Sequence, residues 1–141
     1  MGSIIKQYMG EKRKISIVDD DSFLLDMYAL KFSQNNFEVY TATNGKEAIE
    51  KLKGGLHPDV MLVDVIMPEM DGFEMLEKIN AEKLSPNSVK IILSNKSQQA
   101  DIDRGMGLGV AGYIIKANST PLEVINQVVS ILEKKKVVIP K

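Results

Sequence analysis

The chain has 141 residues, with 18 lysines and arginines, 19 aspartates and glutamates, and no cysteine. That length suits one domain with a buried core and is short for two. The nearly neutral charge argues against a nucleic acid or an anionic membrane as the main partner. Without cysteine, disulfides, thiol catalysis and cysteine-ligated zinc are excluded.

The N-terminal residues 1–13 contain no apolar run long enough for a signal peptide or a membrane span. The chain starts with Met1-Gly2, but Lys6 stands where a myristoylation signal requires serine or threonine. We therefore predict a flexible lead-in over residues 1–13, one domain over 14–136 and a tail over 137–141. The expected location is the cytoplasm.

Five short runs rich in valine and isoleucine alternate with longer amphipathic segments. The runs are 14–18, 37–42, 59–64, 89–94 and 112–116. This alternation is typical of β-α units that build a parallel sheet with helices on both faces. We predict a doubly wound α/β domain with five β-α repeats and the strand order 2-1-3-4-5.

Helix starts between these runs are marked by residue pairs with capping-box spacing. The pairs are Asn44 with Glu47, Asp71 with Glu74, and Thr120 with Glu123. After the last pair, Pro121 suits the first helical position. An apolar stripe is predicted to follow it, made of Leu122, Ile125, Val128, Val129 and Leu132. The lysines at 134–136 are interpreted as the solvated end of that helix rather than a nucleic-acid patch.

Polar side chains stand where four of the five predicted strands end. They are Asp19 and Asp20 after the first run, Asp64 at the end of the third, Ser94 at the end of the fourth and Lys116 at the end of the fifth. Ligands of such sheets bind beyond the carboxyl ends of the strands, so these groups are expected to share one crevice. Adjacent carboxylates repel one another unless a cation offsets them, and an all-oxygen ligand set suits Mg²⁺. Asp21 is expected to start the following helix.

A carboxylate beside Mg²⁺, a hydroxyl and a lysine is suited to accepting a phosphoryl group. Asp64 would attack phosphorus and form an acyl phosphate. Mg²⁺ and Lys116 would neutralise the equatorial oxygens, and Ser94 would donate a hydrogen bond. The sequence therefore predicts a phospho-accepting site.

Four stretches, "IVDD", "VDVIMPEMDGFEML", "IILS" and "GYIIK", together resemble the response regulator receiver domain of two-component signalling. The resemblance runs from about Lys14 to Lys136 and implies the flavodoxin-like (βα)5 fold. It also implies a role for each matching residue: Asp64 as phospho-acceptor, Asp20 as a direct Mg²⁺ ligand, Asp19 as a ligand through water, Ile66 as a ligand through its backbone carbonyl, Ser94 as switch hydroxyl, Lys116 as active-site lysine, and Tyr113 as the aromatic that swings inward.

The same resemblance implies the partners and the kind of activity. The phosphoryl donor would be a sensor histidine kinase, a phosphotransfer protein or a small acyl phosphate. The chain would be a signalling phospho-acceptor that promotes its own phosphorylation and dephosphorylation, rather than an enzyme with a separate substrate. A phosphorylation-dependent dimer is a further expectation, without nucleic-acid or membrane binding through this domain.

Two positions depart from the family pattern. Asn95 follows Ser94 where alanine or glycine is usual, and it is expected to crowd the switch hydroxyl. Ala117 follows Lys116 where proline is common, so the bond between them is expected to be trans.

The sequence also admits three alternative functions, each with a feature against it. A haloacid-dehalogenase-type Mg²⁺-dependent phosphatase would use Asp19 and Asp21, but it leaves Asp64 unexplained. An interaction scaffold without phosphorylation would be expected to lack a key residue, and none is missing. The stretch "GLGVAG", 107–112, fits a dinucleotide fingerprint only in letters, because it precedes a strand instead of following one. His57 is interpreted as an exposed loop residue, and the methionines Met61, Met67, Met70 and Met75 as core and loop packing.

Overall fold

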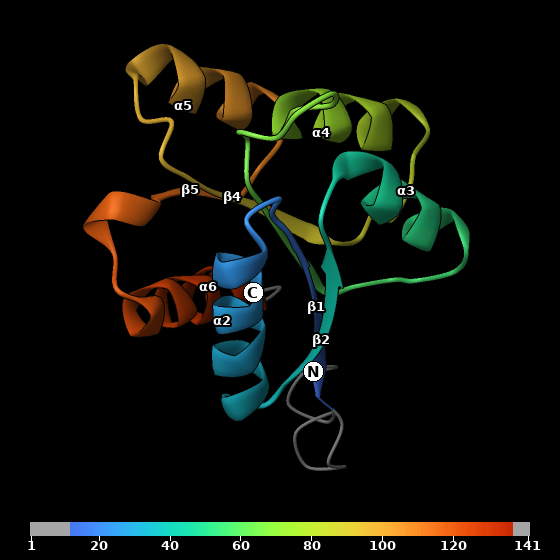
Figure 1. Ribbon diagram of the computed structural model, residues 1–141. Coiled ribbons are helices and arrows are strands. Elements are labelled where there is room, and N and C mark those ends of the chain that lie inside the picture. Colours follow the sequence, from blue (N-terminus) through green and yellow to red (C-terminus); the bar gives the residue numbers. More distant parts are fainter. Residues whose placement is uncertain (1–11, 137–141) are drawn as a thin grey trace, which may run out of the picture.

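The computed structural model describes residues 12–136 (Figure 1). In chain order its elements are β1 (Arg13–Val18), α2 (Ser22–Gln34), β2 (Phe37–Ala42), α3 (Gly45–Lys53), β3 (Val60–Val63), α4 (Gly72–Ala81), β4 (Val89–Ser94), α5 (Gln99–Gly107), β5 (Gly112–Ile115), the 3₁₀ turn η1 (Lys116–Asn118) and α6 (Pro121–Lys136). The predicted tail and all but the last two residues of the predicted lead-in lie outside the described residues. None of the described helices combines the length and the apolar character that a membrane crossing needs.

The five strands form one parallel sheet in the order β2-β1-β3-β4-β5, which confirms the predicted fold and strand order. Three strands have bounds that differ slightly from the sequence prediction. β1 begins at Arg13, and β5 ends at Ile115, so that Lys116 opens η1. β3 covers the four residues Val60–Val63, which leaves Asp59 and Asp64 flanking its two ends.

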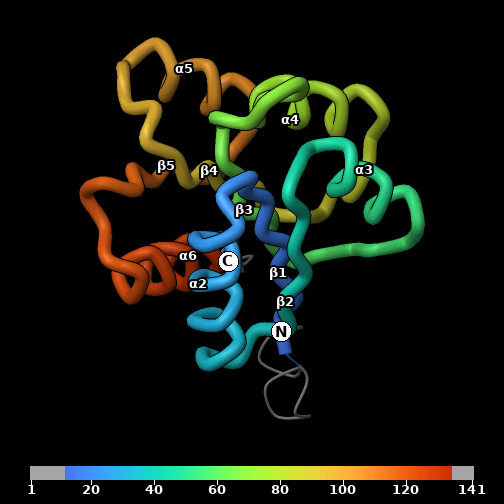
Figure 2. The backbone as a smooth tube through the Cα atoms, in the orientation of Figure 1, coloured from blue at the N-terminus to red at the C-terminus, as the bar shows by residue number. Residues whose placement is uncertain are grey.

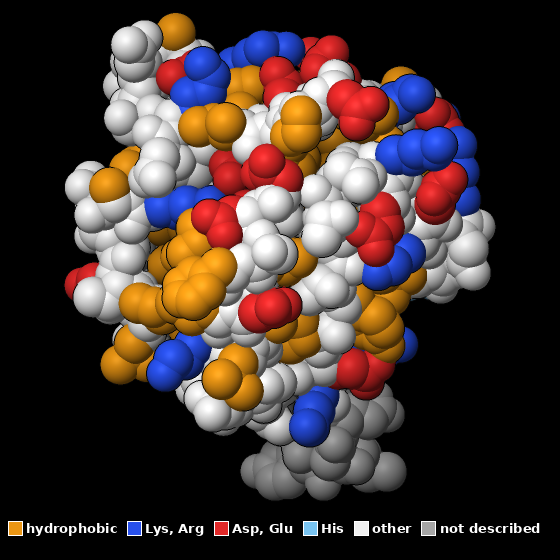
Figure 3. Space-filling model, in the orientation of Figure 1, with side chains coloured by type: hydrophobic (Ala, Val, Ile, Leu, Met, Phe, Trp, Pro, Cys, Tyr) orange, Lys and Arg blue, Asp and Glu red, His pale blue; other side chains and the backbone are white. Residues whose placement is uncertain are grey.

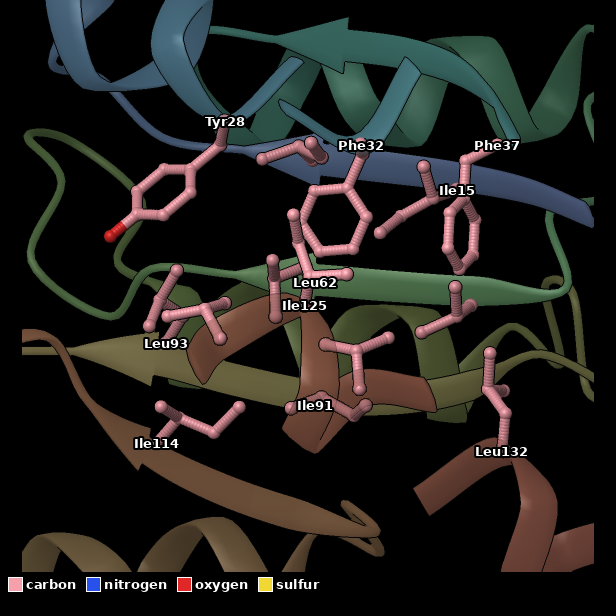
Figure 4. Close-up of a cluster of buried hydrophobic side chains, with 14 of the residues drawn as sticks. Ile15, Tyr28, Phe32, Phe37, Leu62, Ile91, Leu93, Ile114, Ile125 and Leu132 are labelled. Carbon is pink, nitrogen blue, oxygen red and sulfur yellow. The ribbon is translucent and has the colours of Figure 1, made fainter. Parts of the chain in front are cut away.

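Helices cover both faces of the sheet: α2 and α6 pack on one face, and α3, α4 and α5 pack on the other (Figures 1 and 2). Alternate strand residues point to opposite faces, as the β pleat requires. The α2/α6 side is the larger cluster, where Phe32 and Phe37 meet edge to face with ring centroids 5.1 Å apart (Figure 4). The four methionines pack in or against the cluster under α3 and α4, as predicted.

The helix starts follow the predicted capping chemistry with one difference. The Asp21 carboxylate caps α2 by accepting from the Leu24 N–H, and reciprocal capping boxes begin α4 and α6. At α3, Asn44 accepts from the Glu47 N–H as expected, but the Glu47 carboxylate accepts from the N–H of Thr43, one residue before the cap. That bond ties the helix to the preceding loop instead of closing the box.

The predicted stripe on α6 is wrong at Leu122, which is 60% exposed. The buried residues are Val124, Ile125, Val128 and Leu132, and Val129 is half-buried. At 100° per residue, Leu122 lies about 20° beyond Val129, the half-buried edge of the stripe, and about 120° from Val128. The stripe therefore runs through Val124 rather than Leu122.

The stretch 107–112 is a helix end and a turn, not a nucleotide loop. α5 ends at Gly107, and Gly109 has φ +87, a backbone conformation that glycine adopts readily. β5 then begins at Gly112. The order helix, turn, strand is the one that excluded the dinucleotide reading.

Gly72, the first residue of α4, lies against the backbone that follows β3. Its N–H donates to the Val65 carbonyl at 2.9 Å. A Cβ at this position would stand 2.2 Å from the Asp64 carbonyl oxygen and 2.8 Å from the Val65 Cα. Only a residue without a side chain lets α4 approach the end of β3 this closely.

Candidate functional site

The candidate site lies at the carboxyl ends of β1 and β3, where the sheet ladder continues for one residue. Val18 and Val63 are register partners, and the Asp64 N–H donates to the Val18 carbonyl at 2.9 Å. On the other side of β1, the Asp19 N–H donates to the Ala42 carbonyl at 3.1 Å. Both aspartates are therefore held by backbone hydrogen bonds before any side-chain contact is considered.

Three carboxylates gather at this edge. One oxygen from each of Asp19, Asp20 and Asp64 lies within 4.8 Å of the others. Asp19 and Asp64 are buried, at 2% and 6% exposure, whereas Asp20 is exposed. Local backbone N–H groups orient the two buried ones: Asp21 donates to Asp19 Oδ1 at 2.9 Å, and Ile66 donates to Asp64 Oδ1 at 3.1 Å.

Lys116 joins the two buried carboxylates. Its Nζ lies 2.6 Å from Asp19 Oδ2 and 2.9 Å from Asp64 Oδ2. Burial alone would lower the pKa of the Lys116 ammonium, but its hydrogen bonds to Asp19 and Asp64 outweigh burial and raise the pKa. Lys116 is therefore charged at neutral pH. Burial raises the pKa of Asp19, although the bonds from Lys116 and the Asp21 N–H act in the opposite direction.

The donor set fits a hard divalent cation. Three carboxylates against one ammonium leave a formal charge of −3 + 1 = −2 when all four groups are ionised. Every candidate ligand atom is an oxygen, which suits Mg²⁺ and not a soft metal. Because Asp20 is exposed, solvent and dissolved ions can reach the carboxylate cluster from that side.

Ser94 is the last residue of β4, whereas Tyr113 is the second residue of β5 and reaches the loop after β4 with its phenol. Ser94 is fully buried, and its hydroxyl oxygen accepts from the Lys96 N–H at 3.3 Å. As the acceptor in that bond, the hydroxyl keeps its own proton for another partner. The Tyr113 phenol donates to the Lys96 carbonyl at 2.6 Å, and burial, reinforced by the charges of Asp101 and Asp64, raises the pKa of Tyr113 to about 12.

Ile66 is the remaining residue of the predicted set. Its N–H donates to Asp64, and its side chain is 54% exposed beside the carboxylates. Asp21 lies outside the cluster because it caps α2. In the space-filling view, carboxylates and a basic side chain meet above the start of α2, and apolar side chains lie next to them over that helix (Figure 3).

Sequence reasoning missed two contacts of this region. Lys116 was placed near the phospho-acceptor, but it also bonds Asp19. Asn95 was expected to crowd Ser94; its side-chain oxygen instead accepts from the Ala117 N–H at 2.8 Å. The absence of proline at 117, which leaves an N–H there, is the sequence signal that could have suggested this bond. The described residues contain no cis peptide bond, as predicted for Lys116–Ala117.

Comparison with known proteins gives the family. A model described as the response regulator receiver domain matches residues 15–129. The chemotaxis protein CheY of Thermotoga maritima is 35% identical over 119 residues, which cover 82% of this chain and 97% of CheY. The alkaline phosphatase synthesis transcriptional regulatory protein PhoP of Bacillus subtilis is 30% identical over 128 residues, 91% of this chain but 52% of PhoP.

A solved structure agrees with these sequence relatives. The CheY-like receiver domain protein of Methanospirillum hungatei superposes with a TM-score of 0.80 and 27% identity, covering 89% of this chain and 98% of that one. The chain therefore belongs to the response regulator receiver domain family. It spans nearly all of CheY and about half of PhoP. The alternative of a haloacid-dehalogenase-type phosphatase is not supported, because the family differs and Asp21 serves as a helix cap.

Proposed function

We propose that this receiver domain accepts a phosphoryl group on Asp64 in a Mg²⁺-dependent reaction and thereby switches a signalling surface. The observation that carries the proposal is the contact of the Lys116 side chain, which is 9% exposed, with two buried carboxylates at the edge of the sheet. Because one lysine faces three carboxylates, negative charge remains in excess beside Asp64. A site that binds a divalent cation needs such an excess.

In this reaction an Asp64 oxygen forms a bond to phosphorus while the donor's bond to phosphorus breaks. With a phosphohistidine donor the electron pair of the P–N bond stays on the imidazole; with an acyl phosphate it stays on the leaving carboxylate. Asp19, Asp20, Asp64 and the Ile66 carbonyl would hold Mg²⁺, which supplies positive charge to the phosphoryl oxygens when bound. Lys116 supplies a further fixed positive charge, and Ser94 supplies a hydrogen-bond donor.

Burial helps this chemistry. Asp64 and Ser94 lie in a region with little solvent, so charge and dipole interactions act there more strongly than in water. Asp64 is also rigid, because backbone bonds fix it at its own N–H and at its Oδ1. A nucleophile held in one orientation needs little reorganisation to attack.

The proposed donors are a sensor histidine kinase or a phosphotransfer protein, with a small acyl phosphate as a laboratory substitute. Tyr113 is proposed as the aromatic that responds when the Ser94 hydroxyl moves toward the phosphoryl group. Its bond to the Lys96 carbonyl supports this role, since Lys96 is also the residue whose N–H contacts Ser94. A phosphorylation-dependent dimer and a cytoplasmic location belong to the same proposal.

The test is intact-protein mass spectrometry after incubation with acetyl phosphate and Mg²⁺. We expect one phosphoryl gain in the parent protein, none in Asp64→Asn, and very little when the metal is chelated. Asp59→Asn is the matched control, because Asp59 flanks the opposite end of the same strand; it should be phosphorylated like the parent. A full phosphoryl gain in Asp64→Asn would overturn the assignment.

A second measurement separates the proposal from a phosphatase. With a generic phosphate ester in excess, a phosphatase releases many phosphates per protein molecule, which a phospho-acceptor is not expected to do. Sustained release that survives Asp64→Asn would favour the phosphatase instead.

A further inference from the structure

The loops after β4 and β5 are linked by a side chain that the reaction scheme above does not use. Ser94 and Ile115 are the last register partners of these two strands. Beyond them, β5 turns into η1, so the next backbone groups cannot continue the ladder. The Ala117 N–H, just past this point, is bonded by the side chain of Asn95 at 2.8 Å. The link joins residues 22 positions apart in the sequence.

The chemistry of this bond fixes its direction. A backbone N–H can only donate, so the Asn95 oxygen faces Ala117. A proline at 117 would have no N–H and could not form the link. Asn95 and Ala117 therefore depend on each other, although each looks like an isolated departure from the family pattern.

The position of the link gives it a consequence for the site. Ala117 directly follows Lys116, whose Nζ contacts Asp19 and Asp64, and Asn95 directly follows the buried Ser94. Holding Ala117 against Asn95 thus restrains the backbone from which the lysine extends. If the Lys116 ammonium were displaced by about 1 Å from the phosphoryl group on which charge develops, the rate of phosphorylation could fall substantially.

We propose that Asn95 is a positioning residue for Lys116: its bond to the Ala117 N–H holds η1 at the end of β4 and thereby places the Lys116 ammonium over Asp64. The inference rests on the proposed function, since it concerns how the lysine serves phosphorylation. It adds a requirement that the phosphorylation scheme alone does not contain, namely an acceptor at 95 paired with a donor at 117.

The test compares two substitutions of similar size at one position. Asn95→Leu removes the acceptor and should slow phosphorylation of Asp64 by acetyl phosphate about three- to tenfold, the range set by one net hydrogen bond. Asn95→Asp keeps an oxygen acceptor and should recover the parent rate within about twofold. Exchange of the Ala117 amide proton, followed by NMR without metal or donor, should be slow in the parent and Asn95→Asp and fast in Asn95→Leu.

The phosphorylation rates of proteins with Asn, Leu or Asp at position 95 are then measured in the Ala117→Pro background. Each rate is compared only with the others in that background. Since no N–H remains at 117, Asn95→Leu should now change the rate less than about twofold. Any difference between Asn95→Asp and Asn95→Leu there reports effects other than the bond to the Ala117 N–H, such as the added charge. If Ala117→Pro does not fold, the parent-background pair and the amide exchange decide the question.

Two results would overturn the inference while leaving the proposed function intact: a phosphorylated parent whose Asn95→Leu variant reacts at the same rate, or an equal loss with and without proline at 117. A parent that is not phosphorylated on Asp64 would refute the proposed function, and the positioning role with it.

Discussion

The two ends of the sheet both bury polar side chains, but they satisfy them differently. At the amino ends of β3 and β4, side chains bond to the backbone: Ser88 donates to the Pro58 carbonyl, and Lys90 Nζ donates to the Ser85 carbonyl at 3.0 Å. The Asp59 carboxylate accepts from the Lys14 N–H at 2.7 Å. At the carboxyl ends, Lys116 bonds carboxylate side chains instead of backbone groups.

This difference separates polar groups that support the fold from polar groups that are available for chemistry. The ammonium of Lys90 bonds a backbone carbonyl, whereas the ammonium of Lys116 bonds two carboxylates of the candidate site. Burial lowers the pKa of Lys90, with no carboxylate acting against it, whereas two carboxylates raise the pKa of the equally basic Lys116. The carboxyl end thus gathers three carboxylates around one lysine.

The largest expected effect comes from removing the lysine at each end. Lys116→Met leaves Asp19 and Asp64 buried without their partner, so the metal-free protein should lose about 3 kcal/mol of unfolding free energy. Its phosphorylation rate should fall at least about a hundredfold. Lys90→Met should cost about 1 kcal/mol and leave the phosphorylation rate unchanged. Chemical denaturation and phosphorylation kinetics measure both; equal effects of the two substitutions would contradict the comparison.

The next largest effect is expected at Asp20, which belongs to the carboxylate cluster, whereas its neighbour Asp21 caps α2. Asp20→Ala should weaken Mg²⁺ binding at least about tenfold, as loss of a site group typically does. In metal-free buffer it should preserve or raise the melting temperature, because it relieves carboxylate repulsion.

Asp21→Ala is the matched control for Asp20→Ala. It should keep Mg²⁺ affinity but cost about 1 kcal/mol, because it removes the cap of α2. Calorimetric titration with Mg²⁺ and thermal melting distinguish the two variants. A clear fall of the melting temperature for Asp20→Ala without metal would count against the repulsion argument.

A smaller effect is expected at Ile66, whose exposed side chain stands beside Asp64 and has no hydrogen-bonding group. The Ile66 side chain can shield the phosphoryl group but cannot orient an attacking water. Lys96, whose ammonium is paired with Asp101 at 3.5 Å, cannot act as a base toward that water. The phosphorylated protein should therefore persist for minutes to hours. Ile66→Asn should shorten this lifetime several-fold.

The control for Ile66→Asn is Leu30→Asn, which changes a similarly exposed residue on α2 and should leave the lifetime unchanged. The measurement is the decay of phosphoprotein after removal of the donor. Decay within seconds in the parent, or equal lifetimes in the parent and Ile66→Asn, would reject the shielding role.

The smallest effect is an alkaline one at Tyr113. Because its folded-state pKa is about 12 while the ordinary value is 10.0, the folded protein keeps a proton that the unfolded chain releases between these values. Unfolding then releases a proton, so stability falls as pH rises through this window. Tyr113→Phe should show a shallower fall than the parent. Denaturant titrations at several alkaline pH values measure the two slopes, and identical slopes would exclude the phenol as the cause.

Local patterns in the sequence were enough to predict the sheet and the polar residues that lie at its carboxyl edge. Valine-rich runs, capping pairs such as Asp71 with Glu74, and the positions of Asp19 and Asp64 depend on neighbours in the chain, so spacing alone predicts them. The second bond of Lys116, to Asp19, depends on how a long side chain crosses between strands. The Asn95–Ala117 bond depends on where two loops stand after their ladder ends, which no periodicity encodes. Leu122 was misplaced although it has helical spacing with Ile125 and Val129, because it lies in the first turn of α6 at the edge of the stripe, and spacing does not show where burial ends.

The close approach of Gly72 to the end of β3 has a consequence for how substitutions in this domain would be read in a genetic screen. The residue carries no functional group, yet any side chain there would press on the carbonyl of Asp64 itself. Loss-of-signal alleles should therefore arise at Gly72, including Gly72→Ala, as readily as at the charged residues. Gly72 would therefore appear among the positions where substitutions abolish signalling, because of steric contact rather than chemistry. A search restricted to reactive side chains would overlook it.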